Sequence, residues 1–263
     1  KAEAQPEMVA AANAGTVPEN TDSPAPALNE FDPSKYVGAT KFQTRFRPVC
    51  RFFFTRLWKF SLEGFEQIPT TGPAILCANH ISFLDSVFLL TYSPRNMSVV
   101  GKSEYMDSFK TRWLFTKIGM IPLDRSGGEN ATAAMASVEA VLSRGELFGI
   151  FPEGTRSRDG RLYKGRTGAA RLALKFGCPV FPVGITGTSE IMKPDTVMPK
   201  FGKRCKIVIG EPIDTQKYLS RADSPEVLRE LTDEIMVRIQ ALTKQEYVYD
   251  YAPRRSSANR THI

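Results

Sequence analysis

The sequence is poor in the residues that build metal centres and disulfide scaffolds. Its 263 residues include only two histidines and four cysteines. The cysteines, Cys50, Cys77, Cys178 and Cys205, stand far apart and form no CxxC pair. Two histidines do not supply a typical His-rich metal site, and isolated cysteines are typical of reduced thiols. We therefore expect a reduced, cytosolic protein without a metal centre.

Long hydrophobic runs are missing as well. No window approaches the roughly 18 uncharged apolar residues that a membrane-spanning helix requires. Hydrophobic residues make up 42% of the chain and charged residues 24%, proportions that exclude collagen-like, disulfide-scaffold and wholly disordered chains. We find no internal repeats. The length predicts one large domain or two small ones.

The net charge of +7 is spread unevenly. Residues 1–40 have a balance of −4 and few large apolar side chains, a composition that predicts a flexible tail. Residues 144–175 hold eight basic residues against three acids. An excess of positive charge in that later region favours an anionic ligand.

Residues 41–60 have the most unusual composition, with six basic residues, no acid and seven aromatic residues. Pro48 suits the first turn of a helix. The apolar residues that follow it recur at helical spacing: Val49, Cys50, Phe53, Leu57 and Phe60. Arg51, Arg56 and Lys59 fall off that stripe. The pattern predicts a basic amphipathic helix within residues 41–66.

A basic amphipathic helix with aromatic residues favours an anionic membrane surface as its partner. The residues expected to dock are Arg51, Phe53, Arg56, Leu57, Trp58 and Lys59. One alternative is a helix that packs on the protein with its arginines in water. Nucleic acid is a third option, because basic and aromatic residues also bind single strands. No RRM, KH or helix-turn-helix pattern accompanies the segment, so we expect no nucleic-acid partner.

From about residue 72 onwards, β-prone runs alternate with helical stretches. The expected strands are 72–78, 97–101, 120–124, 146–151, 179–185 and 205–210. The expected helices are 82–91, 129–144 and 168–176, followed by a C-terminal helix with Asp223 or Ser224 as its cap and Pro225 in its first turn. The alternation predicts an α/β fold with a mixed, largely buried sheet flanked by helices. We assign this domain to 67–220, and a C-terminal helix and tail to 221–263.

His80 follows the first of these strands and is the only histidine within the predicted domain. Five helical residues would turn His80 and Asp85 about 140° apart, so they do not share a face of one helix. If Ser82 caps the helix, however, Asp85 lies in the first turn and its carboxylate reaches back to the imidazole. That arrangement describes an oriented general base. Alternatively, Ser82 and Asp85 form a capping box that only satisfies backbone donors.

Other strand ends bring more polar residues to the same rim. Lys102 follows the second strand, Arg125 the third and Arg156 the fourth. Ligands of α/β proteins gather at the carboxyl ends of strands, and the planar guanidinium of arginine suits a phosphate. The strand at 179–185 carries proline and glycine, which indicates either a buried edge strand or a wall of Val183 and Gly184 along which a substrate passes.

Four segments together resemble a known family. NHISFLD (79–85), the stretch from Lys102 to Arg125 that ends in IPLDR, FPEGTRS (151–157) and VFPVGITG (180–187) have the order and spacing of the four motifs of the glycerol-phosphate acyltransferase family. The subgroup looks like the bacterial 1-acyl-sn-glycerol-3-phosphate acyltransferases. The likeness covers about residues 79 to 187.

The resemblance implies transfer of a fatty acyl group from acyl-CoA or acyl-carrier protein to a hydroxyl of lysophosphatidic acid, which gives phosphatidic acid for phospholipid biosynthesis. By this analogy His80 is the general base, Asp85 its partner, and Lys102 a donor to the developing oxyanion. The residues implied in binding the glycerol phosphate are Arg125, Glu153, Gly154, Thr155 and Arg156. The thioester is a co-substrate, and no cofactor is expected.

The family also places an N-terminal helical element on the membrane, which residues 41–66 fit. The resemblance thus implies a peripheral or monotopic protein on the cytoplasmic face of the cell membrane. Three alternatives remain open. The acceptor is another lysophospholipid or a glycolipid, His80 activates water in a thioesterase, or the chain binds anionic lipid without catalysis.

Overall fold

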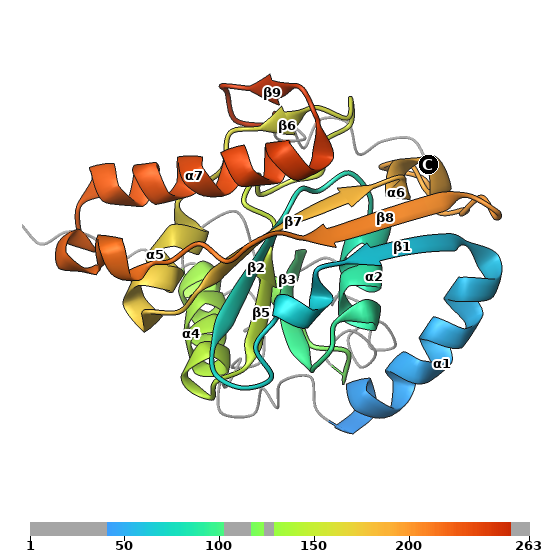
Figure 1. The fold of residues 1–263 in the computed structure, drawn as a ribbon, viewed down its shortest axis with the longest axis horizontal. Helices are drawn as coiled ribbons and strands as arrows, with labels where there is room; N and C mark the ends of the chain where they lie inside the picture. The colour runs from blue at the N-terminus through green and yellow to red at the C-terminus, as the bar shows by residue number, and fades with distance from the viewer. Residues whose placement is uncertain (1–40, 103–116, 124–128, 254–263) are drawn as a thin grey trace, which may run out of the picture. The chain divides into compact units, whose positions relative to one another are not determined.

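A seven-stranded mixed sheet organises the part of the chain that the computed structural model describes, residues 41–102, 117–123 and 129–253 (Figure 1). The strand order is β1-β8-β7-β2-β5-β3-β4. The strands are β1 (Lys59–Glu63), β2 (Ala74–Ala78), β3 (Met97–Lys102), β4 (Met120–Leu123), β5 (Leu147–Ile150), β7 (Val180–Thr186) and β8 (Arg204–Ile209). Strands β7, β2, β5, β3 and β4 run parallel, β8 is antiparallel to β7, and β1 is parallel to β8. The predicted mixed α/β sheet is confirmed.

Helices cover both faces of the sheet because successive strand residues point to opposite sides. On β2, Ile75 and Cys77 pack with α4 (Glu129–Ser143), α5 (Gly168–Phe176) and α7 (Pro225–Thr243). On the other face, Leu76 packs in a second core with α2 (Leu84–Tyr92). All five residues of β2 are buried. The sheet is therefore shielded from water on both sides.

Shorter elements complete the described residues. They are the 3-10 turns η2 (Phe65–Gln67) and η4 (Gln216–Arg221), the helix α6 (Thr188–Ile191), and the two-stranded ribbon of β6 (Leu162–Tyr163) and β9 (Tyr247–Val248). Helix α7 begins as expected, with Pro225 in its first turn and the Ser224 Oγ accepting from the Val227 N–H at 3.4 Å. The predicted flexible tail, 1–40, lies outside the described residues.

Strand β7 is central rather than at an edge, despite its proline. Pro182 falls between the bridge of Val180 to Ile213 and the start of the antiparallel ladder at Val183, so its missing N–H removes no ladder bond to β8. Gly184 is required by packing, because a Cβ there would lie 2.6 Å from the Cβ of Leu242 on α7. Val183 is fully buried in the core. Packing of the core thus accounts for both residues, and a substrate wall at Val183 and Gly184 stays a prediction.

The N-terminal helix α1 (Lys41–Leu57) begins seven residues before Pro48, which lies inside it. The side turned towards the protein includes Gln43 and Arg51, and also Phe54, which packs on the second core. The exposed side carries Phe46, Val49, Phe52, Phe53 and Leu57. The apolar side is thus exposed, as a docking helix requires, and the structure does not have the alternative arrangement in which the apolar side packs on the protein and the arginines lie in water. No helix among the described residues is long and apolar enough to cross a bilayer.

Arg51 explains why its side of the helix faces the protein. Its guanidinium donates to the carbonyl oxygens of Thr91, Tyr92 and Ser93, at 2.8, 3.1 and 2.9 Å, and Arg47 donates to that of Ser93 at 2.9 Å. The last carbonyls of a helix have no partner within it, so these bonds cap the end of α2. The assignment of Arg51 to membrane docking is corrected accordingly.

Two further residues of the predicted docking helix lie elsewhere. Trp58 is buried, and its indole N–H donates to the Lys200 carbonyl at 2.7 Å. Lys59 is exposed but belongs to β1, because the helix ends at Leu57 and the chain joins the edge of the sheet. Arg56, Phe53 and Leu57 remain on the exposed side of α1.

Candidate active site

His80 lies just beyond the carboxyl end of β2 and is bonded to Asp85 in the first turn of α2. The distance from His80 Nδ1 to Asp85 Oδ2 is 2.9 Å. A carboxylate accepts hydrogen bonds, so this contact assigns the proton of the neutral imidazole to Nδ1 and the lone pair to Nε2. The ring also stacks on Phe151, with centroids 4.0 Å apart. The histidine thus has the tautomer and the fixed orientation of a general base.

Asp85 also holds the loop between β2 and α2. Its Oδ2 accepts from the backbone N–H groups of Ile81 and Ser82, at 2.7 and 2.8 Å. The sequence left two alternatives open, a partner of His80 or a residue that caps a helix. In the structure Asp85 has both roles, because the same carboxylate oxygen binds the imidazole and satisfies the backbone donors at the start of α2.

The 151–157 segment clamps the backbone of His80 from both sides. Glu153 Oε1 accepts from the His80 N–H at 3.0 Å, and the Ser157 N–H donates to the His80 carbonyl at 2.7 Å. Since β2 and β5 are parallel neighbours, the loops that follow them meet at one edge of the sheet. The motif after β5 therefore fixes the position of the residue after β2.

Glu153 is only 1% exposed, and its second oxygen accepts from the Tyr163 N–H at 3.0 Å. Burial raises the pKa of Glu153 to about 8, with a further increase from the negative charges of Asp85 and Asp159 that the two backbone bonds partly offset. Both oxygens are occupied by main-chain donors. Glu153 thus holds the main chain of His80 and of Tyr163, and its contact with a substrate phosphate stays a prediction.

Gly154 completes the turn that places Glu153. Its N–H donates to the Phe151 carbonyl at 3.0 Å, and its φ of +74° is in the left-handed region that favours glycine. A Cβ at this position would also lie 3.0 Å from the Arg166 side chain. Gly154 is therefore required by the turn, and contact of Gly154 or Thr155 with a phosphate stays a prediction.

Two residues of the site were missed from the sequence. Thr188, at the start of α6, donates from its hydroxyl to Asp85 Oδ1 at 2.5 Å and is fully buried. Asn79 joins β2 to β7, since its side-chain amide both donates to and accepts from the backbone of Ile185 at 2.8 Å. The only signal for Thr188 was its place after Gly187, next to the fourth motif.

Arg156 lies on the loop beyond Gly154 and is partly exposed. Its Nη2 is 3.9 Å from Asp195 Oδ1, and Arg158 Nε is 2.9 Å from Asp195 Oδ2. Two guanidinium groups thus lie beside a single carboxylate at the same edge of the sheet as His80. An anion with several oxygens, such as a phosphate, suits such a pair.

One more predicted residue, Lys102, lies further along the sheet. Lys102 is the last residue of β3, which is separated from β2 by β5 and ends at the same edge of the sheet. Its main chain pairs with Leu123 at the end of β4. Arg125 lies outside the described residues.

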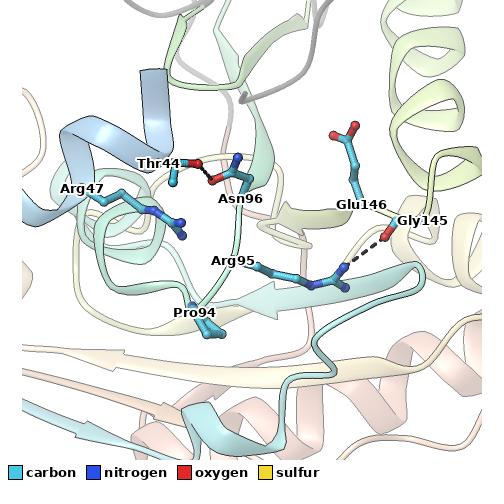
Figure 2. Close-up of a pocket in the computed structure, with 7 residues that line it drawn as sticks. All are labelled: Thr44, Arg47, Pro94, Arg95, Asn96, Gly145 and Glu146. Atoms are coloured by element: carbon cyan, nitrogen blue, oxygen red, sulfur yellow. Dashed lines mark hydrogen bonds between the residues drawn. The ribbon is translucent and has the colours of Figure 1, made fainter. Parts of the chain in front are cut away.

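A separate pocket lies at the opposite edge of the sheet (Figure 2). It is lined by Thr44, Arg47, Pro94, Arg95, Asn96, Gly145 and Glu146. Gly145 and Asn96 precede the amino ends of β5 and β3, whereas His80 follows the carboxyl end of β2. The guanidinium of Arg95 donates to the carbonyls of Gly145 and Gly72, so it serves the fold. The candidate catalytic residues therefore lie at the other edge of the sheet, beside His80.

Comparison with known proteins agrees with the geometry. The family model described as Acyltransferase matches residues 59–186. The chloroplastic 1-acyl-sn-glycerol-3-phosphate acyltransferase of Brassica napus is 29% identical over 189 residues, which cover 68% of this chain and 54% of that protein. The 1-acyl-sn-glycerol-3-phosphate acyltransferase of Borreliella burgdorferi is 25% identical, over 70% of this chain and 73% of that protein. The chain spans about half the length of the plant relatives that it matches.

A solved structure is also similar. The crystal structure of the 1-acyl-sn-glycerophosphate acyltransferase of Thermotoga maritima is 27% identical in sequence, with a TM-score of 0.62. The match covers 76% of this chain and 78% of that one. The two proteins therefore share the arrangement of the sheet and its helices.

Proposed function

Because residues 59–186 belong to the acyltransferase family, we propose that this chain transfers a fatty acyl group from a thioester to a free hydroxyl of lysophosphatidic acid. The donor is acyl-CoA or acyl-carrier protein, and the product is phosphatidic acid. The observation that carries the proposal is the bond of 2.9 Å between His80 Nδ1 and Asp85 Oδ2. It orients an imidazole at the edge of the sheet where ligands of α/β proteins gather.

The proposed reaction is a direct attack of the acceptor hydroxyl on the thioester. His80 Nε2 takes the hydroxyl proton as the oxygen forms a bond to the carbonyl carbon, and Asp85 stabilises the imidazolium that results. When the oxyanion collapses, the carbon–sulfur bond breaks, and the thiol leaves with the proton that His80 returns. The bonds from Glu153 and Ser157 hold the main chain of His80 in place during both transfers.

We assign the charged groups at the same edge to the two substrates. Lys102 ends β3 there and is the proposed donor to the oxyanion. Arg156, with Arg125, is the proposed ligand of the acceptor phosphate. This assignment is supported by the two guanidinium groups of Arg156 and Arg158 that lie beside Asp195.

The exposed side of α1 supports a proposed partner, an anionic membrane surface on the cytoplasmic side. Phe46, Phe52 and Phe53 face outward there, and Arg45 and Arg56 are exposed beside them. Apolar rings next to cations suit the boundary between lipid headgroups and acyl chains. The lipid acceptor would then reach the enzyme from the surface on which α1 lies.

The function is tested by an acyl-transfer assay with an acyl thioester and vesicle-borne lysophosphatidic acid. We expect the His80→Ala variant to lose at least about 10³-fold in kcat/KM. The chain has one other histidine, His262, and His262→Ala serves as a matched control with unchanged rates. Near-normal transfer by His80→Ala contradicts the proposal. An acceptor panel that includes other lysophospholipids and glycolipids identifies the preferred hydroxyl.

The alternatives give different results in the same assay. Thiol release that does not depend on acceptor indicates a thioesterase in which His80 activates water. Vesicle binding without thiol release, and unchanged by His80→Ala, indicates a lipid binder without catalysis. Either result replaces acyl transfer as the function.

A further inference from the structure

The loop of residues 193–203, which joins α6 to β8, exposes three large apolar side chains. Val197 is 86% exposed, Met198 78% and Phe201 64%. Single exposed apolar residues are common, but three within five positions at the tip of one loop form a patch that costs free energy in water. Such a patch suggests a surface that is covered when the protein functions.

The loop has a defined geometry, so the patch is not a chance exposure of an extended chain. The Thr196 N–H donates to the Lys193 carbonyl at 3.2 Å, and the Lys200 N–H donates to the Ile191 carbonyl at 2.8 Å. These bonds close the base of the loop on either side of Val197 and Met198. The two side chains are therefore held outward by the loop itself.

The patch continues the exposed side of α1. The Gly202 N–H donates to the Leu57 carbonyl at 2.9 Å, and the ring of Phe201 lies 6.0 Å from that of Trp58. Leu57 is itself one of the exposed apolar residues of α1. One apolar surface thus runs from the helix onto the loop.

The positive charge of the loop indicates which kind of partner it contacts. Lys193, Lys200 and Lys203 are all exposed. The single acid of the loop, Asp195, lies beside Arg158 and Arg156 and is thereby offset. An apolar tip flanked by cations is complementary to anionic lipids, whose headgroups attract lysine and whose acyl chains accept valine and methionine.

We propose that the 193–203 loop is a second membrane contact, which inserts Val197 and Met198 into an anionic lipid bilayer beside the active site. The proposal extends the proposed function, because the same bilayer carries the lipid acceptor. The loop begins next to the catalytic groups, since the Met192 carbonyl accepts from the Ser82 hydroxyl at 2.7 Å. A bilayer bound at the loop therefore lies against the rim that holds His80 and Arg156.

The experiment measures binding of the full chain to vesicles of phosphatidylglycerol and phosphatidylcholine. The test variant is Val197→Ser with Met198→Ser, which leaves the ring contact of Phe201 intact. The control is Val237→Ser, because Val237 is also exposed but lies on α7, on the other side of the sheet. We expect the double variant to bind at least about tenfold more weakly, and the control to bind like the wild type.

A second measurement reports insertion directly. In Val197→Trp, brominated lipids should quench the added tryptophan fluorescence, whereas in Val237→Trp they should leave it unchanged. Equal quenching at both positions, or equal binding of the double serine variant and the wild type, overturns the proposal. A double serine variant that binds vesicles normally but loses activity only in cells also overturns it, and indicates a protein partner.

The two proposals fail separately. If the wild type transfers no acyl group but the double serine variant still loses vesicle binding, the proposed function is wrong and the loop contact stands. If the wild type is active and the double variant keeps its vesicle binding, the proposed function stands and the loop contact is wrong. With a short-chain, water-soluble acceptor, the double variant should react at the rate of the wild type.

Discussion

Glu153 Oε1 accepts a hydrogen bond of 3.0 Å from the main-chain N–H of His80, so two carboxyl groups hold one histidine. Asp85 binds the imidazole ring, and Glu153 binds the backbone that carries it. Glu153, the acid of the third motif, thus contacts the main chain that carries the proposed general base rather than the space where a substrate would bind. A side chain that the sequence assigned to the substrate thereby supports the proposed catalytic group.

Glu153 makes stability depend on pH. The pKa of Glu153 is about 8 in the folded protein, above the ordinary value of 4.5, so the folded state binds more protons between these pH values. Stability from this group is therefore present below about pH 4.5 and is lost as the pH rises through 8. We expect the wild type to lose a few kcal/mol relative to Glu153→Gln between pH 5 and pH 8.

Urea unfolding of both proteins at several pH values measures this difference. The variant Glu246→Gln is the control, because the Glu246 side chain is 73% exposed. Parallel pH curves for the wild type and Glu153→Gln contradict the prediction.

Thr188 is predicted to position Asp85 through its hydroxyl. Thr188→Val removes the donor to Asp85 Oδ1 and keeps the volume of the side chain, which leaves a buried carboxylate oxygen without that partner. We expect kcat to fall about 10- to 100-fold while KM for both substrates stays unchanged. Thr188→Ser retains the donor and should restore most of kcat. A serine variant as slow as the valine variant argues against this role.

Arg156 should act on one substrate only. We expect Arg156→Ala to raise KM for lysophosphatidic acid about 10- to 100-fold and to leave KM for the acyl donor unchanged, because its guanidinium is the proposed ligand of the acceptor phosphate. Arg171, an exposed arginine of α5, provides the control variant Arg171→Ala. Steady-state kinetics with each substrate varied in turn separates the effects. Equal increases in both KM values remove Arg156 from the phosphate site.

Arg51 and Arg56 lie five residues apart in α1 but should have different effects. Arg51→Gln removes bonds to three carbonyls at the end of α2 and should lower the free energy of unfolding by about 1–3 kcal/mol. Arg56 is exposed, so Arg56→Gln should change stability by less than about 0.5 kcal/mol and weaken binding to anionic vesicles. Denaturant titration and vesicle co-sedimentation distinguish them. The assignment fails if Arg51→Gln leaves stability intact.

The sheet and the pair of His80 and Asp85 could be predicted because their signals are local. Buried strands are short apolar runs between polar breaks, and α5 has the predicted bounds, 168–176. His80 and Asp85 are five residues apart, so their approach depends only on where one helix begins. Features of this kind depend only on residues that lie close together in the sequence.

The orientation of α1 could not be predicted by the same rule. Apolar spacing placed Val49, Phe53 and Leu57 on one side of the helix but left open whether that side meets a membrane or packs on the protein, and it is exposed. The buried side is set by the need of the α2 carbonyls for donors, and that need arises 40 residues further along the chain. Thr188 escaped detection for a similar reason, since it meets Asp85 across 103 residues.

Helix α1 and strand β1 are joined without a linker. Trp58 alone separates them, its N–H donates to the Phe54 carbonyl at 2.9 Å, and β1 pairs with β8 over all five of its residues (Figure 1). Elements joined by flexible linkers move relative to one another, whereas a helix that continues into a sheet edge does not. A surface on which α1 rests therefore keeps a constant separation from His80. The fixed position of α1 on the sheet would then set the depth in the bilayer at which His80 meets a lipid hydroxyl. Acyl transfer would need no change in the tilt of the enzyme on the membrane.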